Sequence, residues 1–240
     1  MEARGNHRRG AQLVPLTPYP VPRLVVFIEF VESLRCPRPH EDSWLVAAAD
    51  RVEGRSIVSG VLGCPVCGAR YRIVDGVVEL LDAAAAPPAP RAALAGASPD
   101  AGEAEVLRAA ALLDLAAPGG TAVLAGAWGA LAPALREVAE VHLLLVNPPF
   151  PARAGEGVSV LRTGGGLPLA AGSVRAAAVD DHTLAALPGA VAALRARGRL
   201  VAPAAERLPA DVTELARDER HWVAERLPPS GPPVPLVRAR

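Results

Sequence analysis

The sequence predicts an α/β protein in which a doubly wound, mostly parallel sheet follows a small, cysteine-bearing β domain. From residue 101 onward, short apolar runs alternate with segments of helical apolar spacing, which is typical of parallel strands joined by right-handed crossovers. All three cysteines lie before residue 82, and an Ala/Pro-rich stretch separates the two parts. We therefore expect a disordered tail over residues 1–22, a cysteine-bearing unit over 23–82, a linker over 83–100 and the α/β unit over 101–240.

The composition excludes several classes of protein. With 51% hydrophobic residues among 240, the chain has enough apolar material for a core and is not wholly disordered. The 25 Lys and Arg residues balance the 25 Asp and Glu residues, so no bulk charge attracts nucleic acid or an acidic membrane. The apolar stretch over 24–31 contains Glu29 and is too short to cross a bilayer, and no signal-peptide cleavage site follows it. Three cysteines are too few for a disulfide scaffold, so we expect a soluble cytoplasmic protein.

Each element of the α/β unit follows from its local pattern. Apolar residues at helical spacing predict a first helix over 104–117, which ends before a Pro-Gly-Gly run. Short apolar runs predict buried strands over 121–125, 141–146, 158–162, 173–179 and 199–202. Further helices are expected over 131–139, 184–197 and 211–220. Two final strands, 221–226 and 234–238, are joined by Pro, Ser and Gly and predict an antiparallel hairpin at the sheet edge.

The cysteines predict a zinc site in the first unit. Two thiolates separated by two residues, as in Cys64-Pro-Val-Cys67, can face one ion, and the glycine that follows permits a tight turn. A tetrahedral structural site needs four ligands; Cys36 supplies the third, and His40, four positions on, is the expected fourth. Because so small a unit has too little core to fold alone, the metal would contribute folding energy.

Other interpretations of these residues stay open. The fourth ligand could instead be Glu41, Asp42, a water molecule or a residue of a partner chain. Cys64 and Cys67 could form a redox dithiol, although no strand-then-helix context follows them. The three cysteines could also be ordinary core residues.

Two stretches, "SLRCP" and "VLGCPVCGARYRIVDGVVELL", resemble the small zinc-ribbon family that includes the activator subunit of tRNA, ribosomal-RNA and release-factor methyltransferases. The resemblance covers about residues 27–81 and is strongest over 71–77, where Asp75-Gly76 suits a two-residue turn between strands. Pro39 stands where the family often has the second cysteine of its first knuckle. The resemblance implies a protein partner such as a methyltransferase or a translation-related factor.

Three stretches of the second unit, "GTAVLAGAWGALAPAL", "GGGLPLAAGSVRAAAVDDHTL" and "LPGAVAALRARGRLVAPA", carry a second resemblance. Their order and spacing resemble the class I S-adenosylmethionine-dependent methyltransferase fold, a Rossmann-like sheet of seven strands, over about residues 104–240. The resemblance implies S-adenosylmethionine as the cofactor, bound by the loops after the first three strands. It assigns to the cofactor site the residues Gly126, Trp128, Gly129, Asn147 and Gly165.

These cofactor positions depart from the family pattern in charge. The loop after the first strand reads Ala-Gly-Ala-Trp-Gly; it lacks the expected acid, and Trp128 adds bulk near the expected path of the cofactor. Asn147 ends the second strand where an acid usually grips the ribose, and Gly165 lies in a glycine run that replaces the acid near the adenine. Three weakened anchors indicate lost or altered cofactor binding, with a misalignment by a residue or two as the alternative.

No motif in the sequence identifies a catalytic residue. Asp181 and His182 follow the fourth strand at the carboxyl edge, where α/β sheets place ligands, and such a pair could deprotonate an acceptor. Alternatively, Asp181 caps the next helix and His182 is solvated. The Asn147-Pro-Pro-Phe run resembles a motif that holds the target nitrogen in amino-group methyltransferases, but its place after the second strand favours coincidence.

The first functional hypothesis is a zinc-binding, degenerate methyltransferase-like protein, a pseudoenzyme that serves as a binding or scaffolding partner. The second is an active S-adenosylmethionine-dependent methyltransferase that acts on RNA, protein or a small molecule. A third is a metal-dependent nucleic-acid binder that uses the arginines of the tail, which the zero net charge does not support.

Overall fold

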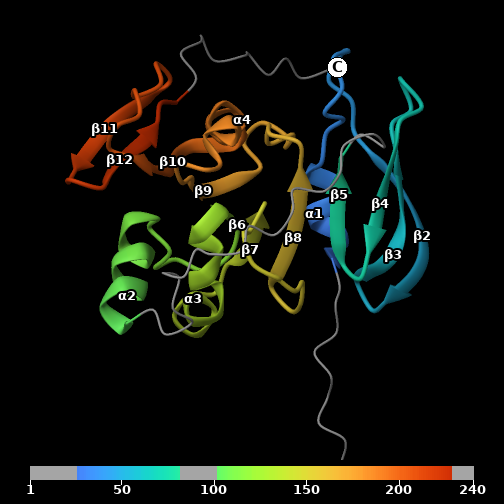
Figure 1. Ribbon diagram of the computed structural model, residues 1–240, viewed down its shortest axis with the longest axis horizontal. Coiled ribbons are helices and arrows are strands. Elements are labelled where there is room, and N and C mark those ends of the chain that lie inside the picture. Colours follow the sequence, from blue (N-terminus) through green and yellow to red (C-terminus); the bar gives the residue numbers. More distant parts are fainter. Residues whose placement is uncertain (1–25, 82–101, 229–240) are drawn as a thin grey trace, which may run out of the picture.

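A computed structural model of the chain describes residues 26–81 and 102–228 (Figure 1). The predicted tail, the predicted linker and the predicted strand 234–238 lie outside the described residues. Within the described part, no helix has the length and apolar character needed to cross a membrane.

The elements alternate between strands and short helices. The N-terminal part contributes β1 (Val26–Phe27), α1 (Ile28–Ser33), β2 (Val46–Glu53), β3 (Ser56–Gly63), β4 (Arg70–Val74) and β5 (Val77–Leu80). The α/β part contributes α2 (Glu103–Leu112), β6 (Thr121–Ala125), the 3-10 helix η1 (Gly126–Leu131), α3 (Ala132–Val138), β7 (His142–Val146), β8 (Val158–Thr163), β9 (Val174–Ala178), the 3-10 turn η2 (Leu184–Ala186), α4 (Leu187–Ala193), β10 (Leu194–Pro203), β11 (Val212–Arg217) and β12 (His221–Arg226). The strands form one mixed sheet in the order β1-β3-β4-β5-β8-β7-β6-β9-β10-β12-β11, with β2 paired to β3.

Five parallel strands form the centre of the α/β part. β6 is hydrogen-bonded to β7 on one side and to β9 on the other, β7 continues to β8, and β9 continues to β10. α2 and α3 lie on one face of the sheet and α4 lies on the other (Figure 1). α2 and α3 share one cluster of buried apolar side chains, and α4 packs in a second cluster. The chain runs from β6 through β7 to β8 on one side and then crosses to β9 on the other side of β6. The carboxyl ends of β6 and β9 therefore flank the topological switch point, where doubly wound sheets bind ligands.

The segment predicted as a helix over 211–220 forms a strand instead. β11 pairs antiparallel with β12, and Asp218 closes the turn between them. Its Oδ1 accepts hydrogen bonds from the N–H groups of Arg220 and His221 at 2.8 and 2.7 Å. The Glu-Leu-Ala-Arg run favours a helix by its intrinsic propensity. It forms a strand here because the hydrogen bonds with β12 outweigh that propensity. Within the described residues, the edge hairpin joins β11 to β12.

The helix predicted over 184–197 ends earlier than expected. η2 and α4 extend only to Ala193, and Leu194 begins β10 by pairing with Val174 of β9. Arg197 adopts a φ of +63° where the register shifts, before the regular ladder resumes at Arg199. Pairing with β9 thus converts the end of a helix-like sequence into the bulged start of a strand.

The N-terminal part and the α/β part share one sheet and one core. β5 runs parallel to β8 along its whole length. Two further backbone hydrogen bonds lie beyond α1, where the Arg35 N–H donates to Pro168 O (2.9 Å) and the Ala170 N–H donates to Ser33 O (2.7 Å). A single cluster of buried apolar side chains extends from β3 and β4 to α4. The cysteine-bearing part is therefore a continuation of the α/β sheet.

His142, at the start of β7, is enclosed where the two parts meet. Its ring lies edge-on to Phe27 with centroids 5.2 Å apart and faces Phe30 at 6.5 Å. Its Nε2 lies 3.0 Å from Ser159 Oγ. Burial, with the positive charge of Arg136 nearby, lowers the pKa of His142 to about 4. The imidazole is therefore neutral in the folded protein across a pH range in which the unfolded chain protonates it.

We expect the free energy of unfolding to fall as the pH drops from about 6.5 to about 4. In this window the unfolded chain binds a proton at His142 and the folded chain does not, so the folded state loses up to about 3 kcal/mol. Urea unfolding of a His142→Gln variant should show a shallower pH dependence than the parent. His182→Gln, which changes an exposed histidine, should keep the parental dependence. Equal slopes for His142→Gln and the parent would show that this imidazole is not responsible.

Candidate functional site

Three cysteines and one histidine come together in the described part of the chain. The Sγ atoms of Cys36, Cys64 and Cys67 and a ring nitrogen of His40 all lie within 4.8 Å of one another. Cys36 Sγ is 3.8 Å from Cys67 Sγ, and His40 Nε2 is 3.4 Å from Cys64 Sγ. A metal held tetrahedrally at about 2.3 Å from sulfur and about 2.0 Å from nitrogen separates its ligands by about 3.5–3.8 Å. The group could therefore hold a metal ion.

The turn that carries Cys64 and Cys67 is formed by local backbone bonds between β3 and β4. The Cys64 N–H donates to Ala69 O at 2.9 Å, and the Gly68 N–H donates to Cys64 O at 3.0 Å. Gly68 has a φ of +68°, a left-handed conformation that glycine adopts without steric cost. The local sequence is therefore sufficient to bring these two thiols to one side of the turn.

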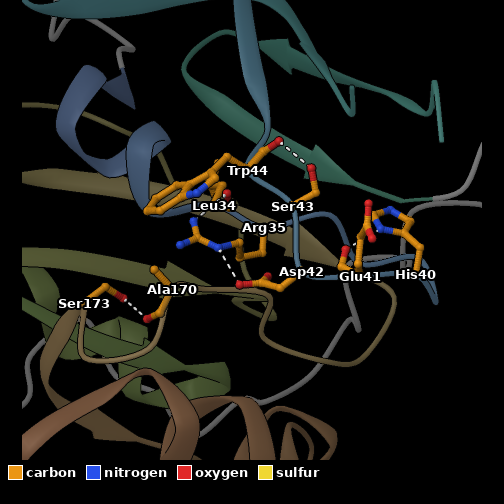
Figure 2. A network of polar contacts seen from close by, with 9 residues as sticks. All are labelled: Leu34, Arg35, His40, Glu41, Asp42, Ser43, Trp44, Ala170 and Ser173. Carbon is orange, nitrogen blue, oxygen red and sulfur yellow. Dashed lines mark hydrogen bonds and ion pairs between the residues drawn. The ribbon is translucent and has the colours of Figure 1, made fainter. Parts of the chain in front are cut away.

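The loop that carries Cys36 and His40 is closed by Arg35 and Trp44, whose backbones form an antiparallel bridge (Figure 2). The Arg35 guanidinium lies 3.0 Å from the centroid of the Trp44 ring, and its Nε donates to the Asp42 carboxylate at 3.1 Å. The side chain of Arg35 is only 10% exposed, whereas that of Asp42 is 77% exposed, so the guanidinium is held by its neighbours while the ion pair stays screened by solvent. This cluster holds the base of the loop in one conformation.

Two contacts orient the ligand atoms from outside the cluster. His40 Nδ1 lies 2.6 Å from the backbone oxygen of Glu41, so Nδ1–H donates to that oxygen (Figure 2). The lone pair of Nε2 therefore faces Cys64 Sγ. The hydroxyl of the buried Tyr71 lies 3.6 Å from Cys36 Sγ. Glu41, an alternative ligand in the sequence, contributes its carbonyl here, whereas the carboxylate of Asp42 pairs with Arg35.

The thiols differ in their readiness to ionise. Burial opposes ionisation of Cys64, but hydrogen bonds from the N–H groups of Cys67 and Val66 outweigh it and lower the pKa of Cys64 to about 6. Burial raises the pKa of the Cys36 thiol and that of the Tyr71 hydroxyl. Cys64 is therefore a thiolate at neutral pH, which is the form that binds metal.

Asp180, which follows β9, forms hydrogen bonds across the switch point. Its Oδ2 accepts a hydrogen bond from the Ala127 N–H at 2.7 Å, in the 3-10 helix that follows β6. Its Oδ1 accepts from the Thr183 hydroxyl at 2.7 Å and from the His182 N–H at 3.1 Å. Gly126 has a φ of +64°, and a Cβ added there would collide with the same carboxylate. The ends of β6 and β9 are thus joined by a side chain of the protein itself.

The side chain of Asn147, at the end of β7, forms two hydrogen bonds with the backbone of the neighbouring strand β8. The Thr163 N–H donates to its Oδ1 at 2.9 Å, and its Nδ2 donates to Thr163 O at 3.1 Å. An aspartate could not donate the second bond, which explains an amide at this position. Gly165, in the glycine run that follows, donates its N–H to the Thr163 hydroxyl at 3.0 Å. The polar groups predicted to contact a ribose and an adenine therefore bond to the protein.

The remaining predicted cofactor residues lie within packed structure. Trp128 is 9% exposed in the apolar cluster of α2 and α3, with its ring 5.1 Å from that of His221 on β12. A Cβ added to Gly129 would lie 3.4 Å from the ring of Phe150, which places the Asn-Pro-Pro-Phe run over η1. The structure therefore brings η1 and this run together.

The weak catalytic candidates Asp181 and His182 are both exposed beside Asp180. His182 contacts Asp180 through its backbone N–H, and the carboxylate that meets the loop after β6 belongs to Asp180. Asp181 and His182 were the candidates predicted from the sequence, and Asp180 was missed. Its place directly after the predicted strand 173–179, at the edge where such sheets bind ligands, was the available signal.

Comparison with known proteins assigns no family to the chain. No family model matches it, and no curated protein matches it. Two of the solved structures that align with this chain do so over 51% of its length. One, a crystal structure of the antibiotic-resistance methyltransferase Kmr, shares 14% identity with a TM-score of 0.34 over 92% of its length. The other, a second crystal structure of that methyltransferase, shares 14% identity with a TM-score of 0.31 over 93% of its length.

Proposed function

We propose that the three cysteines and His40 bind one zinc ion, which holds the N-terminal part together. The donor set supports zinc, because thiolate and imidazole ligands in a tetrahedral arrangement are those that zinc prefers. The hydrogen bond from His40 Nδ1 to the Glu41 carbonyl supports it as well, since metal-bound histidines usually make such a bond. Four protein ligands leave no open coordination position, so the ion would crosslink the loop of Cys36 to the turn of Cys64 without activating a substrate.

We further propose that the α/β part is a methyltransferase-like module for binding or scaffolding and has no catalytic activity. The contact between Asp180 and Ala127 carries this proposal, because it uses a backbone donor of the loop where a cofactor would bind. The amide of Asn147 is likewise used by Thr163. Neither the loop after β6 nor the end of β7 offers an acid to the amino-acid or ribose groups of S-adenosylmethionine.

A scaffolding role needs a partner, and the family resemblance of residues 27–81 suggests its class. We propose a protein partner such as a methyltransferase or a translation-related factor, in a cytoplasm that keeps the thiols reduced. The pairing of β5 with β8 supports a joint role, since the metal-binding part extends the α/β sheet. The balance of 25 basic and 25 acidic residues gives no electrostatic support to a nucleic-acid partner.

The alternative is an active S-adenosylmethionine-dependent methyltransferase acting on RNA, protein or a small molecule. The strand order favours it, because the reversal between β6 and β9 creates the edge at which such sheets bind ligands. The exposed Asp181 and His182 lie at this edge. In this case a cofactor would have to displace the carboxylate of Asp180 from Ala127.

Calorimetric titration with S-adenosylmethionine and S-adenosylhomocysteine separates the two functions. We expect no binding at about millimolar cofactor, because the closed contact competes with any ligand. Asp180→Ala should release the Ala127 N–H and permit weak binding, whereas Asp181→Ala, an exposed neighbour, should behave as the parent. Micromolar binding by the unaltered protein would overturn the scaffold proposal and favour the enzyme.

A further inference from the structure

A cavity of about 310 Å³ lies at the amino edge of the parallel strands, opposite the switch point. Phe27 and Phe30 line it from the N-terminal part, and His142 lines it from the start of β7. Leu169 and Ser173 complete its wall from the loop before β9. Cavities of this size, between two parts of a protein and lined by aromatic side chains, are typical small-molecule sites.

The hydrogen bond between Ser159 and His142 determines which nitrogen of the imidazole ring carries the proton. Ser159 is fully buried, and its hydroxyl contacts His142 Nε2 as its partner among the described residues. A buried hydroxyl that kept its proton unpaired would lose a hydrogen bond, so Ser159 donates to Nε2 and the ring proton lies on Nδ1. Nδ1 makes no hydrogen bond with the described residues. It is also not one of the described side-chain nitrogens that are buried without a hydrogen-bond partner. His142 therefore offers one unused donor.

The cavity shows no unpaired charge among its described lining residues. The carboxylate of Glu29 lies at the cavity and is already paired with Arg55. Burial keeps the pKa of His142 near 4, so that the ring carries no charge at neutral pH. A charged ligand would lose its hydration without gaining a counter-ion, whereas a flat uncharged ring would gain contact with Phe27 and Phe30.

We propose that this cavity binds a small, flat, uncharged heterocycle whose ring nitrogen or carbonyl oxygen accepts a hydrogen bond from Nδ1 of His142. The aromatic and aliphatic walls supply apolar contact, and the imidazole supplies a hydrogen-bond donor that distinguishes one ring from another. The site is independent of the switch point, because its lining comes from the opposite edge of the sheet. It is also separate from the four metal ligands.

Benzimidazole and indole test this proposal, because they share shape and differ in one ring nitrogen that accepts a hydrogen bond. We expect saturable binding of uncharged benzimidazole to the full chain in saturation-transfer NMR, with an affinity about fivefold to tenfold higher than that of indole. His142→Phe keeps an aromatic ring and should remove this preference. His182→Phe, an exposed substitution at the other edge, should preserve it.

The variant Ser159→Ala tests the same hydrogen bond if His142→Phe does not fold. Ser159→Ala removes the hydroxyl that fixes the ring proton, so the preference for benzimidazole should shrink while the apolar contact remains. Filling the cavity with Ser173→Phe should weaken both probes. Equal affinity of the two probes in the parent, a preference that survives His142→Phe, or no saturable binding of benzimidazole would each overturn the proposal.

Discussion

Replacing Cys64 with serine should abolish zinc retention and lower the free energy of unfolding by about 5 kcal/mol, the largest effect expected of any single substitution in this chain. The thiolate is one of the four proposed ligands, which would join the loop of Cys36 and His40 to the turn of Cys64 and Cys67 through the ion. The effect should reach the whole protein, because β5 pairs with β8 and both parts share one core. Metal content and urea unfolding, measured on the same preparations, would quantify it.

The neighbours of His40 supply matched controls for the metal site. His40→Ala should lose zinc, whereas Glu41→Ala should retain it, because Glu41 contacts His40 through its backbone carbonyl. A chelator should destabilise the parent and leave Cys64→Ser unchanged, since the variant has no ion to lose. Metal-free parent protein purified without chelator, or equal stability of Cys64→Ser and the parent, would exclude a structural zinc ion.

Gly126→Ala should lower the free energy of unfolding by about 3 kcal/mol. About 1 kcal/mol comes from the left-handed φ of +64°, and the rest from the collision of the new Cβ with the Asp180 carboxylate, which displaces its bond from Ala127. In an Asp180→Ala background the collision disappears, so the same substitution should cost only about 1 kcal/mol. A double-mutant cycle by urea unfolding should therefore give a coupling of about 2 kcal/mol.

Gly129 provides the matched control, because it lies in the same 3-10 helix as Gly126. A Cβ at Gly129 would lie 3.4 Å from the Phe150 ring, an ordinary contact, and would not touch Asp180. Gly129→Ala should cost no more than about 1 kcal/mol and show no coupling to Asp180→Ala. Additive effects of Gly126→Ala and Asp180→Ala would mean that the carboxylate does not close the switch point.

The parallel strands were predictable because their burial is continuous. The bounds expected for 121–125 match β6, and those for 141–146, 158–162 and 173–179 differ from β7, β8 and β9 by one residue at one or both ends. The strand expected over 199–202 covers only the second half of β10, and the antiparallel β12 matches its expected bounds of 221–226. An apolar run bounded by turn residues marks a strand buried on both faces. The expected helix over 211–220 was wrong, since β11 is an exposed edge strand whose pairing with β12 leaves little trace in its own composition.

The metal ligands and the switch point show different limits of sequence reasoning. The spacing of Cys64 and Cys67 indicates a shared ion because a local turn brings both thiols together. Asp180 gives no comparable local signal, since its role depends on which donor its carboxylate meets across the sheet. The same holds for Asn147, whose amide meets Thr163 of the neighbouring strand.

The sequence by itself determined the cysteine and histidine pattern of the first unit and the parallel core of the second. Only the tertiary structure decided that β5 joins the two parts into one sheet, that Asp180 accepts a hydrogen bond from the loop after β6, and that His142 keeps an unused donor at the opposite edge. The physical reason is the range of the interactions. Turns and strand burial depend on consecutive residues, whereas strand pairing and the partner of a polar side chain depend on segments far apart in the chain.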